Sequence, residues 1–425
     1  MSELVVRKIQ RLSGSVRPPS DKSLTHRAYM LAAMAEGQSV IHNPLLGEDC
    51  ESTLACLRSC GAVTEVVDSE MVRLTGMGRL TGSGLNLDCG NSGTTMRLLS
   101  GLLAASPGLT ATLTGDESLS RRPMSRIVEP LQLMGADIAG MQAPLQITGK
   151  ELTPIDYLSP VASAQVKSCV LLAGTQTAGE TSVTEPALSR DHTELMLAHL
   201  GVPLKFEGLK VTVSQANWEP FEFRVPGDIS SAAFWLVGAA LTPHSDLVLK
   251  DVGVNPTRTG ILDVLESAGI SVERENERTE LGESVADLRV KGADSLRAFE
   301  ISGDLVPRLI DEIPVLAVLA TQCEGTTVIR DASELRVKET DRIAVVADAL
   351  SRMGAEVETT KDGMVIQGPT KLVGTTVDSA GDHRIGMAFT IAGAIAEGET
   401  RIVNAEAIST SYPQFQEHFE QLAVF

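Results

Sequence analysis

Three stretches of the chain place hydroxyl and cationic side chains where a helix is expected to begin. In RPPSDKSLTHR, Ser20 or Asp21 can cap a helix that starts at Lys22. Ser23 and Arg27 then lie in its first turns. The free N–H groups and the dipole of a helix start favour an anion, and Lys and Arg add charge. An ordinary capped surface helix would explain the same residues if this stretch stood alone.

Two further helix starts repeat this chemistry. CGNSGTTMR offers a Gly/Ser/Thr turn that contains Gly93 and ends at Arg97, and SLSRRP follows with Arg122. SPVASAQVKS places Ser163, Gln165 and Lys167 at the start of another helix, so its donors are polar and cationic as well. Many helices begin with such residues, and each stretch alone is weak evidence. Their recurrence at equivalent positions favours an anion-binding site.

Carboxylates stand at a helix start in the second half of the chain. In PRLIDEIPVLAVL, Asp311 and Glu312 precede an apolar helix. They are either a pair that interacts with the helix dipole or the source of a general base at the cleft.

Charged residues also crowd the stretches RVKETDRI and GDHRIG. A solvated surface would explain such a run, but Lys338 and Arg342 are four residues apart and would share one face of a helix. His383 is either a structural hydrogen-bonding residue or part of a site. Cations and carboxylates at helix starts in both halves predict a ligand with two anionic centres. The sequence has no Walker-type phosphate loop, which argues against a nucleoside triphosphate.

The elements that position these residues repeat along the chain. A small-residue-rich helix, a Gly or Pro stop and a β-branched strand recur six times, about 72 residues apart. A second, amphipathic helix that ends at Gly plus a small residue alternates with the first pattern. A repeat of this length exceeds the ~20–50 residues of most solenoids, which predicts small α/β subdomains grouped in two lobes of three, with a ligand cleft between them.

Composition narrows the classes of function. The 425 residues carry a net charge of -19, which argues against nucleic acid and anionic membrane surfaces as partners. The first residues lack the apolar run of a signal peptide, and no apolar run reaches the length of a membrane span. Six cysteines without a C-x-x-C pair are expected to be buried free thiols, and no metal site is expected. These features indicate a cytoplasmic protein.

The quoted motifs resemble those of the 5-enolpyruvylshikimate-3-phosphate synthase family. RPPSDKSLTHR, LDCGNSGTTMRLL, SAQVKS, RVKETDRI and GDHRIGMAF occur in the family's order and over essentially the whole chain. SAQVKS, in place of a double-serine version, is similar to the family's second class. The resemblance implies an α/β fold, a two-lobed inside-out α/β barrel built from six βαβαββ repeats. Lobe 1 would combine residues 1–19 and 227–425, and lobe 2 would span 20–226, with the active site in the cleft between the lobes.

The resemblance also implies which residues form the site. The residues expected to bind shikimate 3-phosphate are Lys22, Ser23, Arg27, Ser163, Ala164, Gln165, Asp311 and Lys338. Those expected to hold phosphoenolpyruvate are Lys22, Gly93, Arg122, Gln165, Arg342 and Arg384. Further candidates are Asn91, Arg190, His383 and Thr410, the last of which stands where some members of the family carry a lysine. Asp311 would accept a proton from the substrate, and Glu339 or Lys22 would donate one.

The implied reaction transfers the enolpyruvyl group of phosphoenolpyruvate to the 5-hydroxyl of shikimate 3-phosphate. It would proceed by addition and elimination through a tetrahedral ketal phosphate, on the pathway to chorismate and the aromatic amino acids. No cofactor is expected, the partners would be the small-molecule substrates alone, and the protein would be a monomer.

Two other functions are compatible with parts of the sequence. The sister enzyme, UDP-N-acetylglucosamine enolpyruvyl transferase, shares the fold, but its loop carries a cysteine shortly before Arg-Pro, and GDESLSRRP has none. A non-catalytic repeat scaffold would show no preference for charge at the six helix starts. Phosphate release with either acceptor would distinguish the three functions.

Overall fold

The computed structural model describes residues 2–425 and divides the chain into two compact units. Unit 1 contains Met1–Pro19, Gly227–Arg278 and Ser284–Phe425, and unit 2 contains Ser20–Pro226 and Thr279–Glu283. The segment Thr279–Glu283 lies inside the range expected for the other lobe. It groups with unit 2 because Leu281 belongs to the hydrophobic core of that unit and Glu283 Oε1 lies 2.8 Å from His192 Nδ1.

Unit 2 contains three four-stranded sheets of one topology. Each sheet has a parallel pair at one edge followed by two antiparallel pairings. The strand orders are β14 (Glu222–Arg224), β3 (Glu36–His42), β5 (Met71–Met77), β4 (Val63–Asp68); β6 (Leu85–Asp88), β7 (Thr110–Thr114), β9 (Leu145–Thr148), β8 (Asp137–Ala139); and β10 (Asp156–Leu158), β11 (Glu180–Thr184), β13 (Lys210–Ser214), β12 (Leu204–Glu207). The threefold recurrence of this arrangement confirms the predicted repeat.

Three helices of unit 2 are buried on nearly every side, because they are built from Ala, Gly, Leu and other small or apolar residues. They are α1 (Lys22–Met34), α3 (Gly93–Ala104) and α6 (Ala164–Thr175). In α3 only Thr94 and Arg97, both near its start, are not buried. The remaining helices, which bury one face, are α2 (Glu48–Ser59), α4 (Glu117–Arg121), α5 (Ser125–Leu133) and α7 (His192–His199). Helices therefore fill the interior of this unit and sheets lie outside them.

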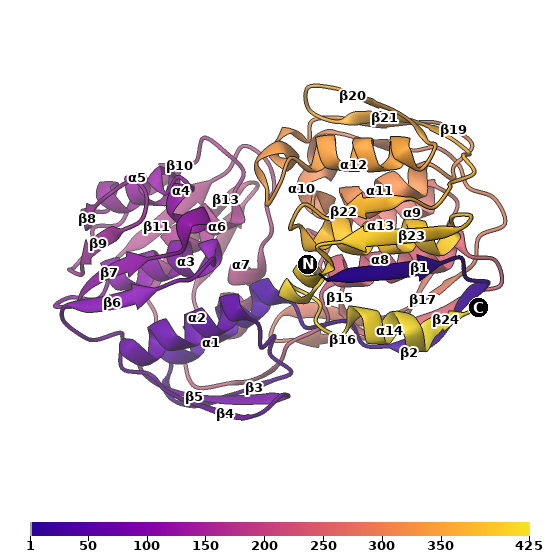
Figure 1. Cartoon of the computed structure of the whole chain (residues 1–425). Coiled ribbons are helices and arrows are strands. Elements are labelled where there is room, and N and C mark those ends of the chain that lie inside the picture. The colour runs from indigo at the N-terminus through magenta and orange to yellow at the C-terminus, as the bar shows by residue number, and fades with distance from the viewer. Residues whose placement is uncertain (1) are drawn as a thin grey trace. The chain divides into compact units, whose positions relative to one another are not determined.

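Unit 1 repeats the plan with contributions from both ends of the chain. The strand orders are β16 (Val272–Glu280), β17 (Glu283–Lys291), β15 (Asp246–Gly253), β2 (Arg11–Val16), β24 (Ala423–Val424); β18 (Glu300–Ile301), β19 (Gly325–Ile329), β21 (Met364–Gly368), β20 (Glu356–Thr359); and β1 (Glu3–Arg7), β23 (Glu399–Val403), β22 (Thr376–Asp378). Figure 1 shows β1, at the start of the chain, beside β23 near its end, and the two strands pair antiparallel.

The interior of unit 1 is again helical. The buried helices α8 (Ile229–Leu241), α11 (Ile313–Ala320) and α13 (His383–Ile395) contact one another. The other helices are α9 (Gly260–Ser267), α10 (Val306–Leu309), α12 (Arg342–Arg352), α14 (Phe415–Leu422) and the short 3-10 helices η1 (Gly303–Leu305), η2 (Ser333–Val337) and η3 (Ala405–Thr410). None of the helices within residues 2–425 combines the length and hydropathy needed to cross a membrane.

Tight turns join each buried helix to the following strand, as the repeat predicts. Gly108 and Gly398 take φ values of +85° and +89°, which side chains rarely adopt. In the fourth copy, where Pro243 replaces the glycine, the next residue, His244, takes φ +59°. All six cysteines are free and buried, as expected.

Candidate active site in two half-sites

The start of α1 presents Lys22 beside an acidic side chain. Asp21 is the N-cap, and its Oδ1 accepts a hydrogen bond from Leu24 N at 2.9 Å. Lys22 Nζ lies 2.9 Å from Asp49 Oδ2, in the first turn of α2. Because the Lys22 side chain is 35% exposed, its ammonium can still reach a ligand.

Arg27, one turn further along α1, is buried and held by three polar groups. Its guanidinium donates to Ser23 O at 3.0 Å, to Thr193 Oγ1 at 2.8 Å and to Ser168 Oγ at 2.9 Å. Burial lowers the pKa of Arg27 to about 10, which leaves it charged at neutral pH. Arg27 thus joins the starts of α1, α6 and α7.

The start of α3 places Gly93 beside two guanidinium groups. A Cβ atom at position 93 would lie 2.9 Å from Arg97 Nη1 and 3.5 Å from Arg122 Nη1. Arg122 Nη2 donates to Asn91 Oδ1 at 2.6 Å. Burial, and then the charge of Arg122, lower the pKa of Arg97 to about 10. The helix start and the two arginines together form a cationic surface that suits a carboxylate or phosphate.

The start of α6 is joined to the start of α3 by one glutamine. Gln165 Oε1 accepts a hydrogen bond from Arg97 Nη1 at 2.6 Å, and its Nε2 donates to Thr94 Oγ1 at 3.0 Å. Ser163 caps α6, with its Oγ accepting from Val166 N at 3.4 Å. The candidate residues on α1, α3 and α6 are therefore brought together within unit 2.

Lys167 does not contribute to this cationic surface, contrary to the expectation from its place at a helix start. Its side chain is 3% exposed, and Nζ lies 2.8 Å from both Glu185 Oε2 and Glu194 Oε1. Lys167 points into the interior because the residue four positions after the N-cap of α6 faces α7.

Unit 1 contains a second cluster, centred on Asp311. Its Oδ1 lies 3.4 Å from Lys338 Nζ, 3.3 Å from Arg342 Nη1 and 4.0 Å from Arg384 Nε. Its side chain is only 13% exposed, so these cations act on it with little screening by water. The structure therefore brings the four candidates together, with Asp311 just before α11.

Arg342 links Asp311 to two further carboxylates. Its guanidinium lies 2.7 Å from Glu339 Oε2 and 2.7 Å from Asp382 Oδ2. Burial opposes the charge of Arg342, but these carboxylates raise its pKa. Burial would also raise the pKa of Glu339, yet Arg342 and His383 outweigh it and hold that pKa at about 2. Without a ligand, Glu339 is thus a carboxylate at neutral pH.

The predicted shared helix face of Lys338 and Arg342 is wrong. Lys338 follows η2, whereas Arg342 is the first residue of α12, which Asp341 caps through Ala344 N. The intervening turn forms because the Asp341 side chain provides the cap that starts a new helix. Both cations nevertheless reach Asp311, through this turn.

The further candidates differ in how close they lie to these clusters. Asn91 binds Arg122, the charge of Arg190 contributes to lowering the pKa of Arg27, and the charge of His383 lowers that of Glu339. Within residues 2–425, the Thr410 side chain, exposed at the end of η3, makes no hydrogen bond to the Asp311 cluster.

Several functional neighbours were not identified from the sequence. Asp49, Glu185 and Asp382 each orient a candidate residue from a distant part of the chain. An N-cap role was predictable for Asp382, because Asp is a preferred residue immediately before a helix. Glu312 is fully buried beside Asp311, and burial raises its pKa. Nothing in the local sequence distinguishes Asp49 or Glu185 from surface carboxylates.

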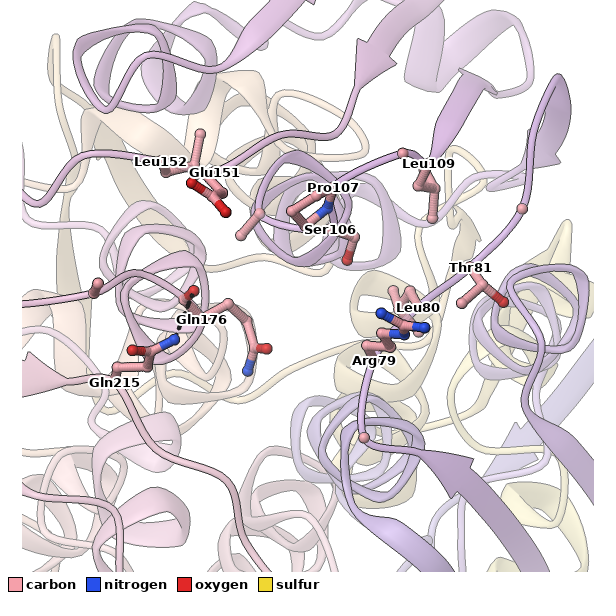
Figure 2. Close-up of a pocket in the computed structure, with 15 residues that line it drawn as sticks. Arg79, Leu80, Thr81, Ser106, Pro107, Leu109, Glu151, Leu152, Gln176 and Gln215 are labelled. Carbon is pink, nitrogen blue, oxygen red and sulfur yellow. Dashed lines mark hydrogen bonds between the residues drawn. The ribbon is translucent and has the colours of Figure 1, made fainter.

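A separate hollow of about 570 Å³ lies within unit 2 at the opposite ends of α3 and α6 (Figure 2). It is lined by Gly78–Gly82, Ala105–Leu109, Glu151, Leu152, Gln176, Ala178 and Gln215. It includes none of the candidate residues and is distinct from the helix starts. Over residues 2–425, no group of three or more His, Cys, Asp or Glu side chains is placed to hold a metal ion.

Comparisons with known proteins give one consistent result. A family model described as EPSP synthase (3-phosphoshikimate 1-carboxyvinyltransferase) matches residues 6–419. Similar curated proteins named 3-phosphoshikimate 1-carboxyvinyltransferase include one from Gloeobacter violaceus, 53% identical over 420 residues and 97% of each chain. Another, from Bacillus licheniformis, is 53% identical over 423 residues and 98% of each chain.

Solved structures give the same result. The structure of EPSP synthase from Acinetobacter baumannii has a TM-score of 0.92 at 43% identity, and the match covers 99% of this chain and 98% of that one. The enolpyruvyl transferase NikO from Streptomyces tendae has a TM-score of 0.78 at 18% identity over 99% and 97% of the chains, which supports the fold alone. The predicted enolpyruvyl transferase fold is confirmed.

Proposed function

The chain belongs to the EPSP synthase (3-phosphoshikimate 1-carboxyvinyltransferase) family, and from this premise we propose a role for each half-site. The protein is a transferase of the shikimate pathway, which moves the enolpyruvyl group of phosphoenolpyruvate to shikimate 3-phosphate. The proposal assigns substrate binding mainly to unit 2 and proton transfer to unit 1.

Shikimate 3-phosphate binds, in this proposal, at the starts of α1 and α6. The phosphate accepts hydrogen bonds from Ser163 Oγ and from the backbone of Ala164 and Gln165, whose first-turn N–H groups have no partner within a helix. Lys22, Ser23 and Arg27 bind the rest of the molecule. The support is that Arg27 bonds both Ser23 of α1 and Ser168 of α6, so these groups form one surface.

Phosphoenolpyruvate binds through arginines that approach it from both units. Arg122 and the backbone of Gly93 at the start of α3 take one anionic group, together with Gln165 and Lys22. Arg342 and Arg384 take the other. The absence of a side chain at Gly93 lets the guanidinium groups of Arg97 and Arg122 lie close to the start of α3, which supports this assignment.

Asp311 is the proposed general base, and its surroundings carry the mechanistic proposal. The carboxylate accepts the proton of the 5-hydroxyl while that oxygen attacks C2 of phosphoenolpyruvate. Lys338 and Arg342, within 3.4 Å of Asp311 Oδ1, hold the carboxylate in place for this step. Lys338 also contacts the bound acceptor.

Glu339 is the proposed acid that protonates the methylene carbon C3, with Lys22 as the alternative donor. A carboxyl group with a pKa of about 2 cannot donate a proton at neutral pH. When Arg342 turns to the carboxylate of phosphoenolpyruvate, however, Glu339 loses its main counter-ion and its pKa rises. Binding of phosphoenolpyruvate thus allows Glu339 to carry the proton that it donates.

The addition forms a C2–O bond and a C3–H bond and gives a tetrahedral ketal phosphate. In the elimination, C3 returns a proton to the protein, the C2–O bond to phosphate breaks, and the enol ether forms. Arginine and lysine side chains neutralise the charge on the departing phosphate. Asp311 passes the proton of the 5-hydroxyl to the departing phosphate, and the acid regains the proton that it gave to C3, so both groups end in their starting protonation states.

This scheme needs both half-sites on one pair of substrates. We propose that residues 1–19 with 227–425 and residues 20–226 act as two lobes whose half-sites meet across the bound ligands, which excludes water. The protein works as a monomer in the cytoplasm, with the two small molecules as its only partners.

The test is phosphate release from phosphoenolpyruvate by the purified protein. Release with shikimate 3-phosphate as acceptor is the expected result. Release with UDP-N-acetylglucosamine alone would indicate the sister activity, and no release with either acceptor would favour a scaffold.

A further inference from the structure

Behind the start of α6 lies a buried carboxylate that neither the reaction nor the motifs explain. Glu185 follows β11 directly, and both of its oxygens are used. Oε1 accepts a hydrogen bond from Ser163 N at 2.7 Å, and Oε2 accepts one from Ser189 Oγ at 2.7 Å. Glu185 therefore holds the N-cap residue of α6 by its backbone.

Lys167 balances the charge of Glu185. Its ammonium lies 2.8 Å from Glu185 Oε2 and 2.8 Å from Glu194 Oε1, and the three side chains are 3%, 3% and 1% exposed. Burial opposes the charge of Lys167, but the two glutamates raise its pKa. This lysine is therefore an internal counter-ion.

The same network also holds Arg27, another residue of the proposed shikimate 3-phosphate site. Thr193, next to Glu194 on α7, accepts a hydrogen bond from Arg27 Nε at 2.8 Å, and its hydroxyl lies 2.7 Å from Ser168 Oγ. One face of α7 thus fixes a guanidinium of α1 and a lysine of α6. Rigid support behind a site of this kind sets the positions of the groups that contact the ligand.

We propose that Glu185 is a positioning residue for the phosphate of shikimate 3-phosphate, an inference that rests on the proposed function. By holding the backbone of Ser163, it directs the Ser163 hydroxyl and the N–H groups of Ala164 and Gln165 at one point. A lone carboxylate behind that point would repel a phosphate. Lys167 offsets the charge of Glu185 while remaining out of contact with the substrate, and burial, which raises the pKa of Glu194, disfavours a second negative charge beside it.

A purely structural role for the same network predicts different behaviour. Loss of a structural ion pair lowers stability and the fraction of active protein, and it changes the binding of every ligand alike. A positioning role changes the recognition of the phosphate group alone. The two roles are separated by comparing shikimate 3-phosphate with shikimate, which lacks the phosphate.

The experiment measures steady-state kinetics of Glu185→Ala and of Glu180→Ala as the matched control. Glu180 is the first residue of β11, the strand that Glu185 follows, and its 53% exposed side chain pairs with Lys205. For Glu185→Ala we expect KM for shikimate 3-phosphate to rise about tenfold, with kcat and KM for phosphoenolpyruvate within about twofold of wild type. The inhibition constant of shikimate as a competitor stays unchanged. The control matches wild type throughout.

Glu185→Gln provides a second test if the alanine variant does not fold. Its Oε1 still accepts from Ser163 N, but Lys167 loses one charged partner, so KM for shikimate 3-phosphate rises about threefold at constant kcat. The proposal is overturned if folded Glu185 variants keep the wild-type KM, or if the inhibition constant of shikimate rises in parallel.

Hydrogen exchange of residues 163–167 separates this inference from the proposed function. Exchange at these amides is expected to be faster in Glu185→Ala than in wild type or Glu180→Ala, whether or not substrate is present. If exchange is faster in Glu185→Ala but the wild-type protein releases no phosphate, the proposed function is refuted, whereas the role of Glu185 in holding Ser163 is retained. If exchange in Glu185→Ala is unchanged, that role is refuted.

Discussion

The half-sites of the two units use opposite chemistry on the same architecture. In unit 2 the starts of the buried helices α1, α3 and α6 present hydroxyls, an amide and cations, and the carboxylates of Asp21, Asp49 and Glu185 beside them are already engaged by backbone N–H groups or by Lys22. In unit 1 the start of α11 presents a carboxylate, Asp311, and the cations surround it.

This difference suggests a division of labour. Neutral donors and cations whose neighbouring carboxylates are already engaged suit the binding of anions. Carboxylates whose pKa values depend on an arginine suit proton transfer, since a ligand that attracts the arginine changes their basicity. The repeated architecture supplies equivalent helix starts, and different side chains at those positions give them different tasks.

The largest effect expected is on turnover after removal of the Asp311 carboxylate. Asp311→Ala should lower kcat by about 10²–10⁴-fold, because a positioned general base contributes that much. The exposed Asp304→Ala in the same unit is the control and should keep wild-type kcat. Turnover of Asp311→Ala within tenfold of wild type would mean that unit 1 does not supply the base.

Arg122→Ala should act on binding instead. Loss of a hydrogen bond between charged groups costs about 1.5–3 kcal/mol, so KM for phosphoenolpyruvate should rise about 10- to 100-fold with a smaller change in kcat. Arg121→Ala is a close control, because that side chain is 76% exposed and pairs only with Glu117. Equal kinetics for the two variants would show that Arg122 does not contribute to the binding of phosphoenolpyruvate.

Gly93→Ala should produce a smaller effect of the same kind. Its added Cβ would lie 2.9 Å from Arg97 Nη1, the mobile end of a side chain, so the guanidinium shifts and the fold survives. KM for phosphoenolpyruvate should rise about three- to tenfold, while the dissociation constant of shikimate 3-phosphate, measured alone, stays the same. A parallel loss of affinity for both substrates would contradict the separation of their binding groups.

The last effect concerns the acid stability of unit 2 and leaves the kinetics aside. Burial of His26 on α1 lowers its pKa to about 3, from 6.5. The folded state therefore excludes a proton that the unfolded state binds, and stability decreases as the pH falls from 6.5 towards 3, by about 1.4 kcal/mol per pH unit from this residue. Urea unfolding at several pH values should show a shallower decrease for His26→Gln, and an identical slope would contradict the assignment.

Much of this organisation is predictable from the sequence. The period of about 72 residues and the helix-ending glycines predict six equivalent units, and the motifs at their helix starts identify the residues that gather in each half-site. Local chemistry decides these features, since caps, turns and apolar helices are set by neighbouring residues.

The remaining features depend on contacts between distant segments. From the sequence, Lys167 resembles a surface cation at a helix start, but in the structure it is buried and forms ion pairs with Glu185 and Glu194. Lys338 and Arg342 look like neighbours on one helix, yet the Asp341 cap separates them and Asp311 brings them together again. Spacing alone cannot show which carboxylate a cation will face after folding.

The division of labour is tested most directly by the affinity of Asp311→Asn for shikimate 3-phosphate, measured by titration calorimetry. Since Asn keeps a hydrogen-bonding group at this position and unit 2 supplies the anion-binding groups, the dissociation constant should stay within about threefold of the wild-type value. A loss of affinity of tenfold or more in this variant would show that Asp311 supplies much of the binding energy for the acceptor, and the assignment of acceptor binding mainly to unit 2 would be wrong.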